Sequence, residues 1–332
     1  MILISVIIVN YNSGQYLQKS VESLFKQIFR QFEIIIIDNA SSDNSASIIN
    51  NIDDIDNMNQ YDDIKITRIF NEENIGFAAA NNKAVKIAQG DLLIFLNPDT
   101  ITKIDWLKIL YQYSLKNPKI AMFGSTQICA ENHNKLDGTG DIYHILGIPL
   151  RSNYGHDIKN IPPTNEIFAP CAAAAMIRRQ YFEQVNGFDE KFFCYCEDID
   201  LAFRLRLIGQ TCLQIKEAII YHHGSAITGR QSKFSIYYGM RNRIWVLIKN
   251  MPLSILILIL PLHLLITFII LLTYLKRGNF LAAARGYGAA IVNIRPIIAE
   301  RKLIQATRSA SYWALMKSFT YSFNEFFKRM KL

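Results

Sequence analysis

Three polar clusters in the first third of the chain have the composition of a ligand-binding edge. Each cluster follows a short apolar run that reads as a β-strand. They are Asn10-Tyr11-Asn12-Ser13-Gly14, Asp38-Asn39-Ala40-Ser41-Ser42-Asp43 and Asn97-Pro98-Asp99. One such cluster alone would be ordinary turn chemistry. Because ligands of parallel α/β sheets bind beyond the carboxyl ends of the strands, three successive clusters predict one binding cleft.

Asp99 is the candidate ligand for a divalent cation. The first predicted strand is followed by neither a Gly-x-Gly-x-x-Gly run nor a Gly-Lys-Ser/Thr loop, so the sequence supports neither the usual dinucleotide site nor a P-loop. The charge of a phosphate-containing ligand must then be neutralised in another way, and Mg²⁺ or Mn²⁺ held by a carboxylate is the obvious one. The plainer alternative is that Asp99 only caps the turn that follows it.

Two later motifs could complete a reaction centre. Glu197, Asp198 and Asp200 fall in the first turn of a predicted helix, where acids favour the helix dipole. One of these carboxylates could instead act as a general base. His222 and His223 follow the last predicted strand; a lone histidine is usually structural, but at a strand end either one is a plausible further metal ligand.

An alternation of strands and helices must position these residues. Strands are predicted at 5–10, 33–38, 65–70 and 92–96, and helices at 15–27, 41–52 and 77–89. The four consecutive isoleucines at 34–37 indicate a strand buried on both faces. This rhythm predicts an α/β fold with a mostly parallel sheet flanked by helices. The polar segment 50–63 reads as a surface loop.

Charge divides the 332-residue chain into two unequal parts. Residues 1–240 contain 22 Lys and Arg against 26 Asp and Glu, whereas residues 241–332 contain 14 against 2, which gives net charges of −4 and +12. A basic tail of this kind binds either nucleic acid or an anionic membrane. Its aliphatic composition, without basic residues interleaved with aromatics, excludes nucleic acid as a partner.

Residues 253–272 form an uncharged, aliphatic run that is long enough to cross a hydrocarbon core of about 20 residues. Basic residues on both sides suit contact with anionic headgroups. Pro261 would kink such a span or turn it into a shallow hairpin, and a helix lying in the membrane interface is a third arrangement. The alternative is a buried hydrophobic helix of a soluble core.

Residues 3 to about 230 resemble a family 2 glycosyltransferase with the GT-A fold, in its rhamnosyltransferase-like branch. The resemblance rests on several stretches in this order and spacing. They are Ser5-Val6-Ile7-Ile8-Val9-Asn10-Tyr11-Asn12, Ile37-Asp38-Asn39-Ala40-Ser41-Ser42-Asp43, Asn74-Ile75-Gly76-Phe77-Ala78-Ala79-Ala80-Asn81-Asn82, Leu96-Asn97-Pro98-Asp99, Gly187-Phe188-Asp189-Glu190, Glu197-Asp198-Ile199-Asp200-Leu201 and His222. The basic, apolar C-terminal segment is similar to the membrane-attaching tail of this branch.

The resemblance implies a role for each matching position. Asp38 would hydrogen-bond the pyrimidine base of a sugar nucleotide. Further residues would line the nucleotide-sugar pocket: Asn10, Asn12, Gly76, Asn82 and Asn97. Asp198 would be the general base, with Glu197 and Asp200 as supporting carboxylates, and Asp99 and His222 would bind Mg²⁺ or Mn²⁺.

Two positions depart from the family pattern. Asn97 replaces the first acid of the family's Asp-x-Asp metal motif, so Asp99 would carry most of the metal bond. The stretch Pro170-Cys171-Ala172-Ala173-Ala174-Ala175 replaces one that often carries glycine before its small residues and that faces the acceptor in this family.

The resemblance also implies an activity and an organisation. A hexose, with rhamnose favoured, would pass with inversion from a dTDP- or UDP-sugar to a hydroxyl of a glycan or polyprenyl-linked acceptor, at the cytoplasmic face of the cell membrane. Residues 1–240 would form the catalytic domain, with 1–100 binding the donor and 101–240 the acceptor, and residues 241–332 would attach it to the membrane. The alternatives are a membrane-bound scaffold with a degenerate site and a sugar nucleotidyltransferase; the opening loop lacks the basic residues of the latter.

Overall fold

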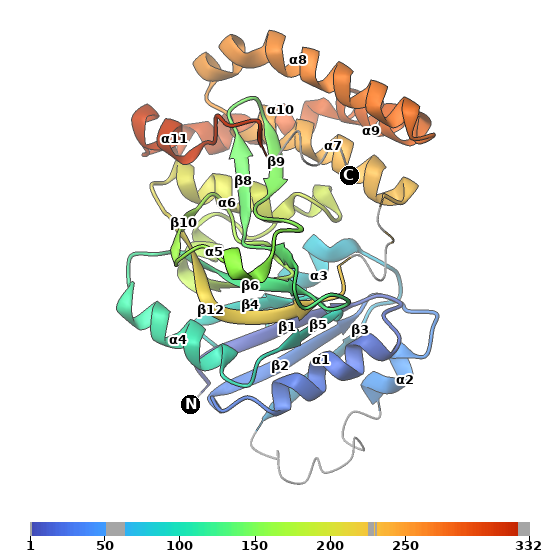
Figure 1. Cartoon of the computed structure of the whole chain (residues 1–332), viewed down its shortest axis with the longest axis vertical. Coiled ribbons are helices and arrows are strands. Elements are labelled where there is room, and N and C mark those ends of the chain that lie inside the picture. The colour runs from blue at the N-terminus through green and yellow to red at the C-terminus, as the bar shows by residue number, and fades with distance from the viewer. Residues whose placement is uncertain (1, 51–63, 225–228, 230, 325–332) are drawn as a thin grey trace.

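The computed structural model describes residues 2–50, 64–224, 229 and 231–324. A twisted sheet fills the lower half of the molecule, and helices from the C-terminal part of the chain form a layer at the opposite end (Figure 1). Nearly all of the predicted surface loop at 50–63 lies outside the described residues.

A ten-stranded mixed sheet forms the centre of the fold. Its strands are β1 (Ile4–Asn10), β2 (Phe32–Asp38), β3 (Lys65–Phe70), β4 (Leu92–Leu96), β5 (Thr100–Thr102), β6 (Met122–Cys129), β7 (Leu136–Gly138), β10 (Asn165–Ile167), β11 (Ala174–Arg178) and β12 (Cys212–His222). The main path runs β10–β12–β6–β11–β4–β1–β2–β3. As predicted, β1 pairs in parallel with β2 and β4, and β2 with β3. β11 runs antiparallel between β4 and β6, which makes the sheet mixed.

Helices cover both faces of this sheet and create a core on each side. They are α1 (Gln15–Phe25), α2 (Ser45–Asn50), α3 (Gly76–Val85), α4 (Trp106–Lys116), α5 (Arg179–Gln184) and α6 (Glu197–Leu207). The isoleucines of β2 alternate between the cores: Ile34 and Ile36 pack with the apolar residues of α1 and α4, and Ile35 and Ile37 with those of α3 and α6. The prediction of a strand buried on both faces is therefore confirmed.

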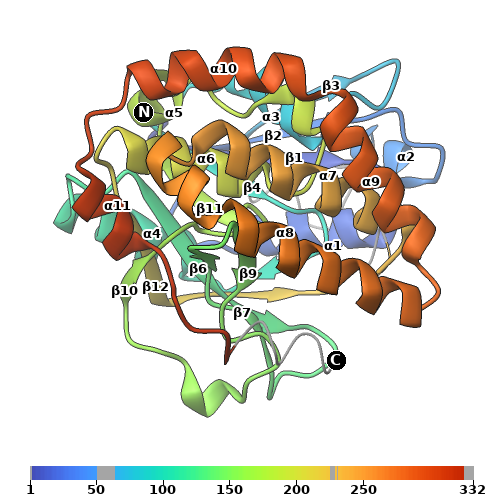
Figure 2. The same ribbon diagram turned by 90° about the horizontal axis from the view of Figure 1, so that it is seen from above.

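A small hairpin and a layer of helices complete the chain. Strands β8 (Asp141–His144) and β9 (Ile148–Arg151) form the hairpin, and its turn reaches the helical layer (Figure 1). The helices are α7 (Lys233–Asn250), α8 (Leu253–Lys276), α9 (Phe280–Val292), α10 (Ile294–Ala306) and α11 (Tyr312–Ser318). Figure 2 shows α8 lying across this end of the molecule, with α9 beside it and α10 along the opposite edge, on the other side of α7.

Helix α8 is long, apolar and mostly uncovered. It continues through Pro261 without a break, so this segment is not a hairpin. Among the described residues it is the one helix long and apolar enough to cross a membrane, and 28% of its most apolar 18-residue window is buried. The alternative of a buried core helix is therefore excluded.

Buried ion pairs and hydrogen bonds connect helix α7 of the helical layer to α6. The Asp200 carboxylate is fully buried and accepts hydrogen bonds from Arg204 Nε (2.8 Å), Lys249 Nζ (3.1 Å) and Asn250 Nδ2 (2.8 Å). Lys249 Nζ also lies 2.5 Å from Asp189 Oδ2. The expected boundary at residue 240 falls inside α7, so this helix joins the two expected domains.

The same helix holds a strained segment directly before α6. Phe193, Tyr195 and Cys196 all have positive φ, between 64° and 68°, a conformation that costs a residue with a side chain about 1–3 kcal/mol. The buried Asn242 amide of α7 donates to the carbonyl oxygens of Phe192, Cys194 and Tyr195, at 2.7–2.9 Å. This side chain therefore stabilises the path of the segment that leads into α6.

We expect Lys249→Met to destabilise the fold by about 3–5 kcal/mol, because removal of the lysine leaves the buried Asp200 carboxylate and its partly buried neighbour Asp189 undercompensated. Urea denaturation of the full chain measures the change. Lys108→Met, on the exposed face of α4, is the matched control and should change stability by less than about 0.5 kcal/mol. Equal stability of the two variants would show that the buried ion pairs do not hold the layers together.

Candidate functional site

A cavity of about 710 Å³ lies at the carboxyl ends of the central strands. It is bounded by the loops after β1, β2 and β4, by the start of α6 and α7, and by the β8–β9 hairpin. Seven residues expected from the sequence to act in the site line it. They are Asn12, Gly76, Asn97, Asp99, Glu197, Asp198 and His222. The three polar clusters that predicted one cleft all contribute to it.

Asn10 and Asp38 lie behind the cavity wall, both almost fully buried. The parallel register of β1 and β2 sets them side by side, and Asn10 Nδ2 donates to Asp38 Oδ1 at 2.6 Å. Asp38 Oδ2 accepts the Ser41 backbone N–H at 3.0 Å. These two side chains therefore fix the two loops that form the wall.

Asn12 and Gly76 shape the same wall, whereas Asn82 lies apart from it. Asn12 has a φ of 52°, and its Oδ1 accepts the backbone N–H of Ser42 at 2.7 Å. A Cβ at Gly76 would lie 2.7 Å from the Phe193 carbonyl oxygen, so only glycine fits there. Asn82 lies outside the cavity lining, where its side chain bonds both the N–H and the carbonyl of Phe188.

Asp99 and His222 face each other at one end of the cavity. His222 Nε2 lies 3.3 Å from Asp99 Oδ1, and His222 Nδ1 lies 2.8 Å from Asp137 Oδ2. Burial acts to lower the pKa of His222, but the Asp99 and Asp137 carboxylates outweigh it and raise that pKa to about 9. A divalent cation could take the place of the proton between Asp99 Oδ1 and His222 Nε2, because carboxylate and neutral imidazole both bind metal ions, with Asp137 orienting the ring from behind.

The two adjacent histidines differ sharply in their surroundings. His223 turns away from Asp99, and its Nδ1 lies 3.0 Å from Glu131, a mostly exposed carboxylate. The sequence left the choice between the two histidines open. The geometry favours His222 as the ligand.

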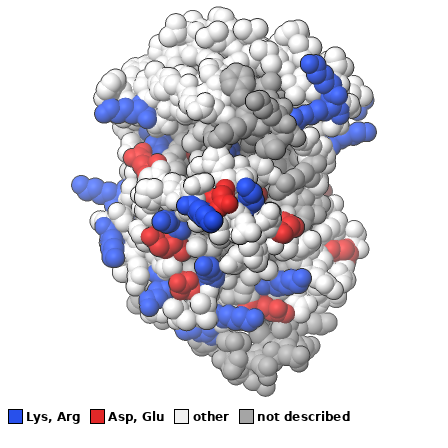
Figure 3. Space-filling view, viewed as in Figure 1, with Lys and Arg blue, Asp and Glu red and all other residues white. Residues whose placement is uncertain are grey.

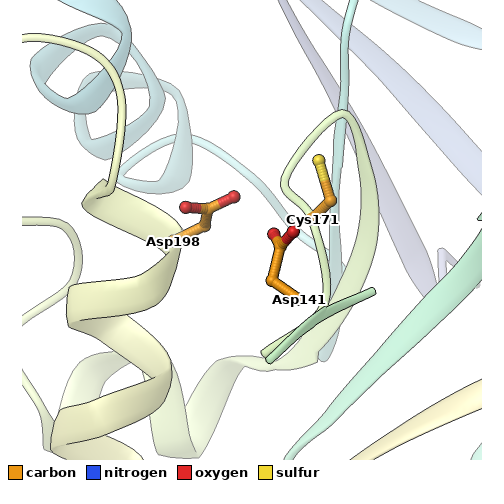
Figure 4. A group of neighbouring side chains, drawn as sticks. All are labelled: Asp141, Cys171 and Asp198. Carbon is orange, nitrogen blue, oxygen red and sulfur yellow. The ribbon is translucent and has the colours of Figure 1, made fainter. Parts of the chain in front are cut away.

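Asp198 lies in a second charged cluster of the cavity, together with Asp141 and Cys171. The carboxylates of Asp198 on α6 and Asp141 on β8 point toward each other (Figure 4), and one ligand atom from each of the three residues falls within 4.8 Å of the others. Arg151 donates to Asp141 Oδ1 at 3.0 Å and to Cys171 Sγ at 2.7 Å. The guanidinium already supplies positive charge here, so this cluster fits a second metal ion poorly.

The protonation of this cluster follows from its burial. Burial raises the pKa of Asp198, while the Ala172 N–H, which donates to Oδ2 at 3.0 Å, and the nearby Arg151 guanidinium act in the opposite direction. Burial and the adjacent Asp198 raise the pKa of Glu197 well above its usual range. Burial also raises the pKa of Cys171 to about 12, so this thiol stays neutral near pH 7.

Asp200 is not part of the cavity. It is the buried partner of Lys249 and Arg204 described above, and it does not line the site. One face of α6 thus presents Asp198 to the cavity, while Asp200 anchors the helix on another. Asp200 supports the site through the position of the helix.

Sequence reasoning missed a chain of charged groups that joins the two ends of the cavity. It runs from His222 through Asp137 to Arg151, whose Nη1 lies 3.2 Å from Asp137 Oδ2, and on to Asp141. Asp137, Asp141 and Arg151 come from 126–164, where apolar periodicity is weak. No motif in the sequence marks them.

The sequence of the chain is similar to those of known glycosyltransferases. The model of the family "Glycosyl transferase family 2" matches residues 5–185. An uncharacterised glycosyltransferase of Haemophilus influenzae is 34% identical over 244 residues, which is 73% of this chain and 85% of the relative. The rhamnosyltransferase WbbL of Escherichia coli is 28% identical over 218 residues, 62% of this chain and 78% of the relative.

A solved structure also shares the fold. It is a mannosyltransferase of Pyrobaculum calidifontis in complex with GDP-Man and Mn²⁺, which aligns with a TM-score of 0.55 at 17% identity, over 95% of this chain and 86% of that one. At this identity the likeness concerns the fold alone. Together with the mixed, helix-flanked sheet it confirms the GT-A fold expected from the sequence.

We expect His222→Ala to weaken Mn²⁺ binding by roughly 10- to 100-fold, in the range seen when groups at or around a metal are removed. His223→Ala is the matched control and should bind Mn²⁺ as the unaltered protein does, because His223 faces Glu131. Titration of Mn²⁺ followed by electron paramagnetic resonance reports the free ion directly. The opposite order of effects would move the metal site to His223.

Proposed function

Because the chain belongs to glycosyl transferase family 2, we propose that it transfers a sugar from a nucleoside-diphosphate donor to a hydroxyl of a glycan acceptor in cell-surface polysaccharide synthesis. The observation that carries this proposal is the cavity itself. A carboxylate suited to act as a base, Asp198, shares it with Asp99 and His222, which are suited to a cation. Arg151 and Asp137 connect the two ends.

We favour rhamnose as the sugar, carried on dTDP, with UDP-sugars as the other donors to test. Support comes from the 62% of this chain that aligns with the rhamnosyltransferase WbbL. The donor would lie across the strand ends, along Asn12, Gly76 and Asn97. Asp38 remains our candidate for the pyrimidine base, since it directly precedes Asn39, which lines the cavity.

The proposed reaction is a single displacement that inverts the anomeric centre. Asp198 takes the proton of the acceptor hydroxyl as that oxygen forms a bond to the anomeric carbon. The bond between the anomeric carbon and the diphosphate oxygen breaks, and the nucleoside diphosphate leaves with the electron pair. The N–H groups of Ala172 and Ile199, which donate to the two Asp198 oxygens, hold this carboxylate toward the acceptor.

Asp99 and His222 would hold Mg²⁺ or Mn²⁺, with Asn97 beside them. When bound, the metal ion neutralises charge that develops on the departing diphosphate. Asp137 orients the His222 ring: Nδ1 of the ring faces the Asp137 carboxylate, and Nε2 faces Asp99. Arg151 offsets the negative charge of Asp137 and Asp141 behind the reacting groups.

We further propose that the protein works at the cytoplasmic face of the cell membrane on a polyprenyl-linked acceptor. The support is the exposed apolar helix α8 and the net charge of +12 over residues 241–332. An acceptor anchored in the bilayer would be held close to the cavity by an enzyme attached to the same surface.

We expect Asp198→Asn to lower donor-dependent nucleoside-diphosphate release by about 10²- to 10⁴-fold, because the amide cannot take the acceptor proton. The assay uses the full chain in detergent with Mn²⁺ and a panel of dTDP- and UDP-sugars, with water in place of the acceptor hydroxyl. Asp91→Asn is the matched control, since Asp91 is exposed and lies before β4, at the end of the sheet away from the cavity. Calorimetry should show that both variants still bind the donor.

Release with one donor, lost only in Asp198→Asn, would name the sugar. Failure of every donor to bind in the presence of Mn²⁺ would overturn the proposal and leave a membrane-bound scaffold. Release that Asp198→Asn leaves unchanged would remove Asp198 from the reaction.

We expect kcat/KM to fall on the acid side at a higher pH than an ordinary aspartate would give. A base must be ionised to act, and burial raises the pKa of Asp198, so protonation begins at higher pH. Arg151→Met should move this acid limb to still higher pH, because the guanidinium of Arg151 favours the ionised form of Asp198. A pH profile with its acid limb at the usual aspartate pKa of about 4 would contradict this.

A further inference from the structure

Helix α8 has a buried face and an exposed face over residues 255–267. Ile255, Ile259, His263 and Ile266 form a buried stripe at helical spacing. The rest of the surface is large, aliphatic and exposed, with Leu258 at 79%. A face of this size and composition needs an apolar partner.

The buried stripe is fixed to the body of the protein near the middle of the helix. His263 Nδ1 donates to the Leu146 carbonyl oxygen at 2.7 Å, in the turn of the β8–β9 hairpin. Arg243 Nη2 of α7 donates to Thr267 Oγ1 at 3.2 Å. The neighbouring Gly147 has a φ of 80°, and a Cβ there would lie 3.1 Å from His263 Nδ1. The hairpin backbone therefore lies directly against α8.

These contacts conflict with a transmembrane placement. If α8 spanned a bilayer, residues 263–267 would lie near its centre, where Leu146 and Arg243 of the folded body cannot follow them. A helix that keeps these bonds can only lie along the surface. We propose that α8 is an in-plane helix, whose exposed aliphatic face enters one leaflet of an anionic bilayer while its opposite face stays bound to the catalytic domain. This inference rests on the membrane attachment proposed above and specifies its geometry.

Charge favours an anionic lipid surface over a second copy of the chain. Between Glu217 and Glu300 the sequence contains no acidic residue, whereas Lys276, Arg277 and Arg285 follow the apolar run closely. In Figure 3 the end of the molecule formed by α8 is almost entirely white, with blue side chains at its two edges. Two such faces docked on each other would bring like charges together. Anionic headgroups would meet them with opposite charge.

The first test is flotation of the full chain with phosphatidylcholine vesicles, with and without phosphatidylglycerol. We expect binding that increases with the anionic lipid and falls at least tenfold in Leu258→Glu/Leu265→Glu. Leu115→Glu, at a comparably exposed leucine of α4, is the matched control and should float normally. Absence of vesicle binding, or a dimer that the double variant dissociates, would overturn the proposal.

The second test separates an in-plane helix from a span. Leu258, Leu265 and Leu272 are exposed and seven residues apart, so they lie on one face over about 21 Å of helix. Each is replaced by Trp in a Trp313→Phe background, where the remaining Trp106 and Trp245 are buried inside the protein. Quenching by lipids brominated at different depths therefore reports on the introduced Trp. Equal depths for all three support the in-plane helix, and Leu265→Trp deeper than both others overturns it. Nucleoside-diphosphate release in detergent needs no vesicles, so it tests the transferase separately.

Discussion

The buried carboxylate of Asp200 requires positive charge, and much of the architecture follows from how this is supplied. Arg204 comes from the same helix, but Lys249 and Asn250 come from α7, in the C-terminal part of the chain. Because a buried charge without partners is strongly unfavourable, α6 and α7 must pack together. The start of α6, which carries Glu197 and Asp198, is thereby placed by residues far from it in sequence.

The same dependence on charge organises the cavity. Asp99, His222, Asp137, Arg151 and Asp141 alternate in sign, so that each buried group has an opposite charge beside it. A divalent cation held by Asp99 and His222 would replace the proton of His222 Nε2 and so keep this pattern at one end. Transfer of the acceptor proton to Asp198 would neutralise a carboxylate at the other end. The two halves of the proposed reaction therefore share one electrostatic environment.

The sequence was most informative where local chemistry decides structure. The isoleucines of β2, the polar clusters at the strand ends and the acids of α6 each indicated their position without help from distant residues. Arg151, Asp137 and Asp141 could not be found in this way, because they lie on short strands that carry no periodic signal and acquire meaning only through their contacts. Asp200 illustrates the same limit: it shares a motif with Asp198, yet the two residues lie about 200° apart around the helix, so that one is an anchor and the other a cavity residue.

The contact between α6 and α7 also imposes an order on biosynthesis. A ribosome makes the sheet and α6 first, and at that stage Asp200 has only Arg204 as a charged partner. Lys249 and Asn250, and the Asn242 amide that secures the strained turn at 193–196, are translated later. The nascent chain therefore cannot complete its reaction centre until α7 has emerged, immediately before the apolar helix α8. Maturation of the enzyme and its arrival at a lipid surface would then be nearly simultaneous events.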